Sequence, residues 1–186
     1  MTTLAPQRMK FTVDSYYKMA EHGLLGKDRQ VELINGDIID MSPIRSAHAG
    51  MVNYLSKILI HCLFNKATVC VQNPVHLDDF SEPEPDVLIA QFSQDDYRER
   101  HPRVDEVILL IEVADSSLIF DRNVKKALYA EASIPEYWII NLADEQIEIF
   151  QQPQDGEYQQ MKIVKKTDHF STTIQGEEVV FEKLFG

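Results

Sequence analysis

The segment from Glu106 to Asn141 constrains the fold of this chain more than any other part. It contains an aliphatic run over 106–114, a helix-like stretch from 120 or 121 to 132, and a second apolar run over 136–141. Apolar, β-branched runs of this length are typical of buried strands. Two strands joined by a helix predict a parallel pair with a crossover connection. We therefore expect an α/β fold with a mixed, mostly antiparallel central sheet and helices on both of its faces.

The rest of the chain predicts two further helices and several antiparallel strands. Thr12 to about His22 predicts a first helix, with Thr12 as its N-cap and Gly23 at its end. The Asn35-Gly36 pair lies between alternating runs at 30–34 and 37–41, which indicates a β-hairpin. Apolar residues at helical spacing predict the longest helix over 46–65. The other predicted strands cover 68–77, 86–91, 146–151, 158–165 and 178–181, and Pro74 indicates a break or an edge position within the first of them.

Length and composition limit the classes of protein to which the chain can belong. Its 186 residues predict a single domain, 1–186. No stretch approaches the roughly 20 consecutive apolar residues of a membrane helix, and the N-terminus lacks the layout of a signal peptide. We therefore expect a cytoplasmic protein with no membrane partner. The net charge of −12 argues against a generic nucleic-acid coat protein, but it is compatible with a nuclease that has a local basic patch.

Two acidic residues lie at or near the ends of apolar, β-branched runs. Asp86 precedes Val87-Leu88-Ile89-Ala90, and Glu112 lies near the end of the 106–114 run. A carboxylate removed from water is costly unless a positive charge or hydrogen bonds compensate it. Two such acids on neighbouring strands are a candidate divalent-metal site, and oxygen ligands suit Mg²⁺ or Mn²⁺ better than zinc. Taken singly, Asp86 could be a turn residue and Glu112 a strand-end acid without a chemical role.

Lys125 falls on the apolar face of the predicted helix, together with Leu128, Tyr129 and Ala132. A lysine that faces a sheet needs either a snorkelling route or a buried acid as its partner. Glu112 precedes this helix in the chain and is the expected partner. The pair is then either an inert ion pair or, with Asp86, a hydrolytic centre.

With these residues the chain resembles the PD-(D/E)xK nuclease superfamily, and more specifically the restriction-endonuclease-like proteins of the Uma family. The resemblance covers about residues 10–150. The matching text is Val31-Glu32-Leu33-Ile34-Asn35-Gly36-Asp37-Ile38, Met41-Ser42-Pro43, His48, Pro83-Glu84-Pro85-Asp86, Ile111-Glu112-Val113, Ser116-Ser117, Asp121, Lys125, Tyr129 and Ile134-Pro135-Glu136-Tyr137-Trp138-Ile139-Ile140. One position departs from the superfamily pattern, because Ala114 stands where the lysine usually follows the strand acid. The resemblance implies that Lys125, on the following helix, has taken over its role.

The resemblance implies a Mg²⁺-dependent endodeoxyribonuclease with a restriction-endonuclease-like fold and DNA as its substrate. Asp86 and Glu112, with the carbonyl oxygen of Val113, would hold the ion, and Lys125 would orient the attacking water or share the charge of the transition state. Glu32, on the first hairpin strand, is either a further acid of the metal shell or an exposed strand residue. For His48, three alternatives stay open: a contact with substrate, a contact with a carboxylate, or neither of these.

Other interpretations stay open at this point. A catalytically inactive nucleic-acid-binding or assembly module would keep the same fold, and hydrolysis of another phosphoester or a protein-interaction role would also be compatible with it. By analogy with single-domain nucleases that cut both strands, we expect a homodimer. Tyr137 and Trp138 could form a platform for bases, but neighbouring strand residues point to opposite faces, so at least one of them should lie in the core.

Overall fold

The computed structural model describes residues 8–26, 29–182 and 184–185. The chain divides into two compact units. The smaller unit comprises residues 1–41 and 76–83, and the larger comprises residues 42–75 and 84–186. The expectation of a single domain over 1–186 stays a prediction. No helix in the described part of the chain is long and apolar enough to cross a membrane.

The smaller unit contains the predicted N-terminal helix and hairpin. Helix α1 (Val13–Glu21) begins after Thr12, whose Oγ1 accepts a hydrogen bond from the Ser15 amide at 3.2 Å. Strands β1 (Val31–Ile34) and β2 (Asp37–Asp40) pair antiparallel. Asn35 and Gly36 join them with φ angles of 50° and 73°, and a two-residue turn with two positive φ angles suits the twist of a hairpin. Both sequence predictions are confirmed here.

The larger unit is built on a six-stranded mixed sheet whose strand order follows the chain. Its strands are β3 (Ala67–Val71), β4 (Val87–Gln91), β5 (Val107–Ala114), β6 (Glu136–Asn141), β7 (Gln146–Gln154) and β8 (Glu157–Lys165). Strands β5 and β6 pair parallel, and the other neighbours pair antiparallel. The crossover between β5 and β6 runs through α3 (Leu118–Phe120), the π-helical segment η2 (Asp121–Lys125) and α4 (Lys126–Glu131). The predicted strand-helix-strand unit is therefore confirmed.

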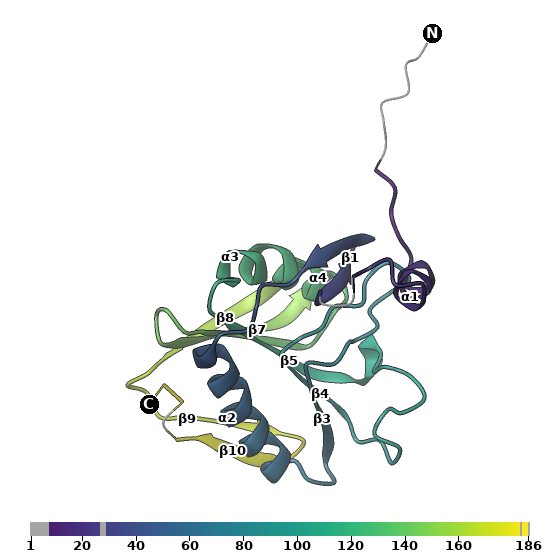
Figure 1. Cartoon of the computed structure of the whole chain (residues 1–186). Helices are drawn as coiled ribbons and strands as arrows, with labels where there is room; N and C mark the ends of the chain where they lie inside the picture. Colours follow the sequence, from purple (N-terminus) through teal and green to yellow (C-terminus); the bar gives the residue numbers. More distant parts are fainter. Residues whose placement is uncertain (1–7, 27–28, 183, 186) are drawn as a thin grey trace. The chain divides into compact units, whose positions relative to one another are not determined.

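Helices lie on both faces of this sheet, as Figure 1 shows. One face packs against α2 (Ser46–Cys62) and the ribbon of β9 (Phe170–Ile174) and β10 (Glu177–Phe181). The crossover helices cover the opposite face. The short 3₁₀ helix η1 (Val104–Glu106) leads into β5.

Two adjacent aromatic residues of β6 show how the two faces are filled. The Trp138 ring lies 5.3 Å from Phe170 on the α2 side, and the Tyr137 ring lies 4.9 Å from Tyr129 of α4 on the other side. Both residues are completely buried. The core interpretation of the Tyr-Trp pair is therefore correct for both members.

The strand boundaries differ from the predictions at three places. The strand predicted over 68–77 ends at Val71, because Gln72 has a φ of 51° and Pro74 follows. Strand β7 runs three residues further than predicted, because Asp155 and Gly156 form a second two-residue turn with φ angles of 53° and 78°. Strand β9 lies in a segment where no strand was predicted.

Candidate active site

Asp86 and Glu112 lie next to each other at the ends of neighbouring strands. The register pairs Val87 of β4 with Ile111 of β5, so the next residues outward are Asp86 and Glu112. Asp86 Oδ2 accepts a hydrogen bond from the Val113 amide at 2.8 Å. The two acids keep only 8% and 4% of their surface exposed. The fold thus places two buried carboxylates side by side, as the sequence suggested.

Lys125 joins this pair from the crossover helix. Its Nζ donates to Glu112 Oε1 at 2.9 Å, and the hydroxyl of Tyr129 donates to the same oxygen at 2.9 Å. Lys125 is 1% exposed and Tyr129 is fully buried. The helical-face argument therefore identified the correct orientation of Lys125 and its correct partner. An ion pair this deeply buried must gain enough from charge attraction and hydrogen bonding to offset the desolvation of both groups.

The π-helical segment η2 contains the site lysine as its last residue. The Lys126 amide donates to the carbonyl of Asp121, five residues earlier, instead of four as in an α-helix. Asp121 is 2% exposed, and its Oδ2 accepts a 2.6 Å hydrogen bond from the Ser117 hydroxyl. Segments of this kind are rare and often occur at functional sites. Asp121 and Lys125 are the buried residues of this segment.

Two further side chains contact Asp86, one from α2 and one from the residue after β3. His48 Nε2 lies 3.0 Å from Asp86 Oδ2, and Gln72 Nε2 donates to Asp86 Oδ1 at 3.3 Å. The hydrogen bond with Asp86 raises the pKa of the His48 imidazole above its ordinary value, although partial burial opposes this. Nδ1 of the same ring is buried and has no hydrogen-bond partner among the described residues. His48 therefore contacts a carboxylate of the site, which was one of the two roles considered for it.

A second acid–base pair lies on the same face of the sheet as Glu112. The register links Glu112 to Ile139 of β6, and Ile139 to Glu148 of β7. Glu148 is fully buried, and Arg122 Nε donates to its Oε2 at 2.9 Å while Arg122 Nη2 contacts its Oε1.

Further donors reach the Glu148 carboxylate. Asn141 Nδ2 and Gln146 Nε2 each donate to Oε1 at 3.1 Å. Burial alone would raise the pKa of this carboxyl. The hydrogen bonds from Arg122, Asn141 and Gln146 outweigh that effect and hold its pKa below the ordinary value. Glu148 is therefore a stable anion that anchors Arg122.

Glu32 lies on β1 of the smaller unit, where it is fully buried. The alternative of an exposed strand residue is therefore wrong. Asp86, Glu112 and Lys125 all belong to the larger unit. The role of Glu32 as a further acid of a metal shell stays a prediction.

The donor set near Asp86 suits a hard divalent cation in its chemistry. In the described part of the chain, no group of three or more His, Cys, Asp and Glu side chains is arranged to hold a metal ion. The candidate ligands of the larger unit are two carboxylates and a backbone carbonyl oxygen. Oxygen donors of this kind suit Mg²⁺, which usually keeps several waters and takes only one or two protein carboxylates.

Several residues of this arrangement received no role from the sequence alone. Tyr129 lies four residues after Lys125, so its presence on the same helical face was visible, but a tyrosine on an apolar face is equally typical of a core. Gln72 and Glu148 gave no signal, because each lies in a strand or strand end with ordinary polar character. Their contacts depend on which strands become neighbours.

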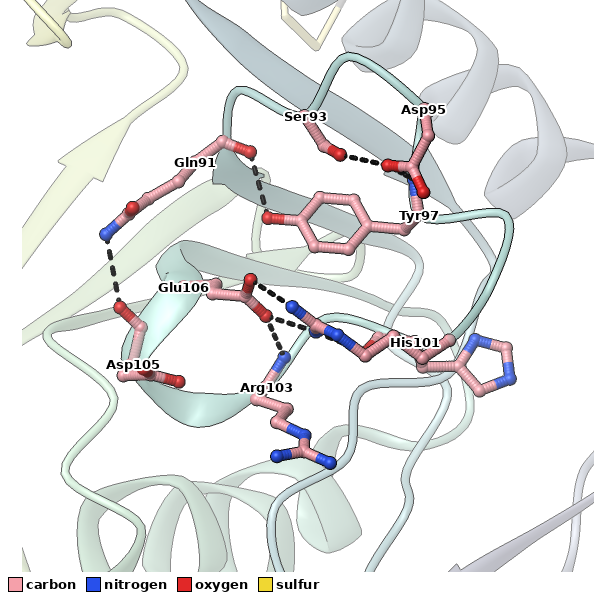
Figure 2. A network of polar contacts seen from close by, with 9 residues as sticks. Gln91, Ser93, Asp95, Tyr97, His101, Arg103, Asp105 and Glu106 are labelled. Atoms are coloured by element: carbon pink, nitrogen blue, oxygen red, sulfur yellow. Dashed lines mark hydrogen bonds and ion pairs between the residues drawn. The ribbon is translucent and has the colours of Figure 1, made fainter.

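The basic run from Arg98 to Arg103 lies far from these acids. Arg100 donates to both oxygens of Glu106 at 2.6 Å, and its guanidinium lies 5.6 Å from the centre of the Tyr97 ring. Figure 2 shows this network, in which the Tyr97 hydroxyl also reaches the Gln91 carbonyl. It borders a pocket of about 250 Å³. Glu106 directly precedes β5, at the opposite end of that strand from Glu112, so the network does not belong to the site.

Comparisons with known proteins concern the family and the fold of this chain. The model of the Uma2 family, described as "Putative restriction endonuclease", matches residues 13–180. A crystal structure described as a "putative nuclease belonging to DUF820" from Anabaena variabilis has a similar fold, with a TM-score of 0.64 and 14% sequence identity. The alignment covers 88% of this chain and 89% of that chain. At this level of identity the likeness concerns the fold alone. No curated protein matches the sequence.

Proposed function

Because the chain belongs to the Uma2 family of restriction-endonuclease-like proteins, we propose that it is a metal-dependent endonuclease that hydrolyses DNA phosphodiester bonds. The observation that carries the proposal is the grouping of Asp86, Glu112 and Lys125. Two of these residues come from neighbouring strands and the third from the crossover helix. Families of this kind generally use divalent metals, and two adjacent buried carboxylates are the expected oxygen ligands.

We propose that Asp86 and Glu112 would hold Mg²⁺ or Mn²⁺ together with the carbonyl oxygen of Val113. Such an ion lowers the pKa of a bound water and stabilises negative charge on phosphate oxygens. Asp86 is suited to this role because its Oδ1 accepts a single, long hydrogen bond of 3.3 Å from the residues that the structure describes. A carboxylate oxygen can accept two hydrogen bonds or ligand contacts, so Oδ1 keeps capacity for a cation.

The protein side chains around these ligands fix their positions. The Val113 amide and His48 hold Asp86, while Tyr129 and Lys125 hold Glu112. Side chains that are locked before substrate arrives stabilise a transition state more effectively than mobile ones. In this scheme Lys125 orients the attacking water or shares the developing charge on the phosphate, and Tyr129 is a positioning residue.

Nicking of supercoiled plasmid DNA tests the proposal. The wild-type protein should nick DNA with Mg²⁺ or Mn²⁺ and not with EDTA. Asp86→Asn should lower the rate at least about 100-fold, because even changes next to metal ligands cost roughly 10–100-fold. Mg²⁺ should also raise the melting temperature of the wild-type protein more than that of Asp86→Asn. Asp105→Asn is the matched control, because Asp105 is an exposed residue before the start of β5.

Two results would overturn the enzyme proposal. Equal nicking by wild type and Asp86→Asn would show that the activity comes from elsewhere. DNA binding without turnover, with the same affinity in both proteins and no effect of either metal on stability, would instead favour a catalytically inactive nucleic-acid-binding module with this fold.

A further inference from the structure

Resting on the proposed nuclease function, we propose that Arg122 binds a phosphate of the DNA backbone close to the one that is cleaved. Arg122 and Lys125 both belong to the π-helical segment η2 of the crossover. It is paired with Glu148, which lies on the same sheet face as Glu112. Its side chain is 40% exposed, whereas that of Lys125 is 2% exposed.

The guanidinium of Arg122 has donors to spare. An arginine carries five N–H groups in a planar fork. Glu148 accepts from Nε and from one N–H of Nη2. Within the described residues, Nη1 of Arg122 makes no hydrogen bond. The side of the fork that points away from Glu148 can therefore donate to a phosphate, which arginine binds with good geometry.

Glu148 holds Arg122 more firmly than a simple ion pair would. The carboxylate is fully buried and also accepts hydrogen bonds from Asn141 and Gln146. Asn141 is held in turn by Asp144, whose Oδ2 accepts from Nδ2 at 2.9 Å. A cation fixed in this way loses little conformational entropy when it binds a ligand.

The distance from Glu112 suits a neighbouring phosphate. Glu112 and Glu148 are two strands apart, which corresponds to about 10 Å at the usual strand spacing. One DNA strand presents a phosphate for every 3.4 Å or so of helix rise. A DNA strand whose cleaved phosphate lies at Glu112 therefore passes Arg122 at a phosphate about one to three nucleotides away from the cleaved one.

The charge of the whole molecule makes such a contact more important. The net charge of −12 repels DNA at long range. The basic run at 98–103 offers little compensation near the site, because Glu106 neutralises Arg100 there. The contrasting interpretation is that Arg122 only fastens the crossover helix to β7.

The salt dependence of DNA binding distinguishes the two interpretations. A labelled DNA duplex is titrated with each protein by fluorescence anisotropy in EDTA, so that no cleavage occurs, at KCl concentrations between about 25 and 200 mM. Loss of one phosphate contact reduces the slope of log K against log [salt] by about 1 and weakens binding to all sequences alike. We expect this result for Arg122→Gln. Arg122→Lys keeps the charge and should keep most of the slope.

Arg100→Gln is the matched control, because it removes the same charge and breaks a similar arginine–glutamate pair away from the site. It should leave the slope unchanged. An unchanged slope in Arg122→Gln, with wild-type binding intact, would overturn this inference and leave the nuclease proposal standing. Equal loss of slope in Arg122→Lys and Arg122→Gln would also overturn it. Absence of DNA binding by the wild-type protein would overturn the proposed function and this inference together.

Discussion

The buried pair of Glu112 and Lys125 permits a quantitative prediction about stability. Lys125→Met removes the cation that lies 2.9 Å from Glu112 Oε1 and leaves a carboxylate with 4% exposure. Breaking a buried pair by removing one partner costs about 3–5 kcal/mol. Glu112→Gln leaves a buried ammonium group and should cost a similar amount. Both losses are large against the roughly 5–15 kcal/mol that stabilises a typical domain.

The double variant Glu112→Gln/Lys125→Met should be less damaged than the two single changes predict together. Neither of the two positions then carries a charge, so the desolvation cost of the pair disappears with its attraction, and replacement of whole buried pairs is often close to neutral. We expect a favourable coupling of at least about 2 kcal/mol, which is within the range for residues in contact. Urea unfolding followed by circular dichroism gives the four free energies of unfolding, those of wild type, the two single variants and the double variant. In thermal unfolding, each single variant should melt about 6–20 °C below wild type.

An exposed ion pair in the same unit provides the control. Lys166 Nζ lies 2.7 Å from Glu145, and the two side chains are 44% and 47% exposed. Lys166→Met should cost less than about 1 kcal/mol, because water already solvates both charges. If Lys125→Met is as mild as Lys166→Met, or if the single losses simply add in the double variant, the reasoning about a desolvated pair is refuted.

Two further predictions concern the same sheet face. The variant Lys125→Ala/Ala114→Lys moves the lysine to β5, two residues after Glu112 and on the same face. Its plasmid nicking should exceed that of Lys125→Ala alone. An equally inactive double variant with a normal melting temperature would show that only the helix position supports cleavage. The pKa of Glu148 is held low in the folded protein, so its stabilising contribution is present above the unfolded pKa of about 4.3 and is lost as the pH falls through the folded pKa. Glu148→Gln should therefore be clearly less stable than wild type at pH 7, and this difference in urea unfolding should shrink at pH 3. A difference that stays constant between the two pH values would contradict the assignment.

Much of this fold could be predicted because the local signals agree with the final structure. The run 106–114, the helix after it and the strand at 136–141 indicated the parallel pair directly. The Asn35-Gly36 turn indicated a hairpin that the structure contains. The ribbon at β9 could not be predicted in this way, because Ser171, Thr172 and Thr173 carry little apolar signal. This strand is ordered by contacts from distant parts of the chain, such as that between Phe170 and Trp138.

In the candidate site too, local sequence signals predicted some residues, and contacts from distant parts of the chain determine others. The orientation of Lys125 followed from the helical period, because the lysine interrupts an otherwise apolar stripe. The burial of Glu148 could not be derived in the same way, because Gln146-Ile147-Glu148-Ile149 alternates like a strand with one face in water. The crossover segment, which lies over that face, supplies Arg122 to the buried glutamate. Residues whose environment is created by a distant element are therefore not visible in local patterns.

The π-helical segment η2 and the α-helix that follows it tolerate changes of length differently. Lys125 ends η2, and from Lys126 onward the helix is α-helical. The turn of η2 holds one residue more than an α-helical turn, so a deletion within it can be absorbed by an ordinary α-helical turn. Lys125 and Tyr129 both contact Glu112 Oε1, and deleting a residue between them would rotate Tyr129 by about 100° and carry it away from Glu112. We therefore expect relatives that keep the function to conserve the residue count from Lys125 to Tyr129 even where they change the residues between.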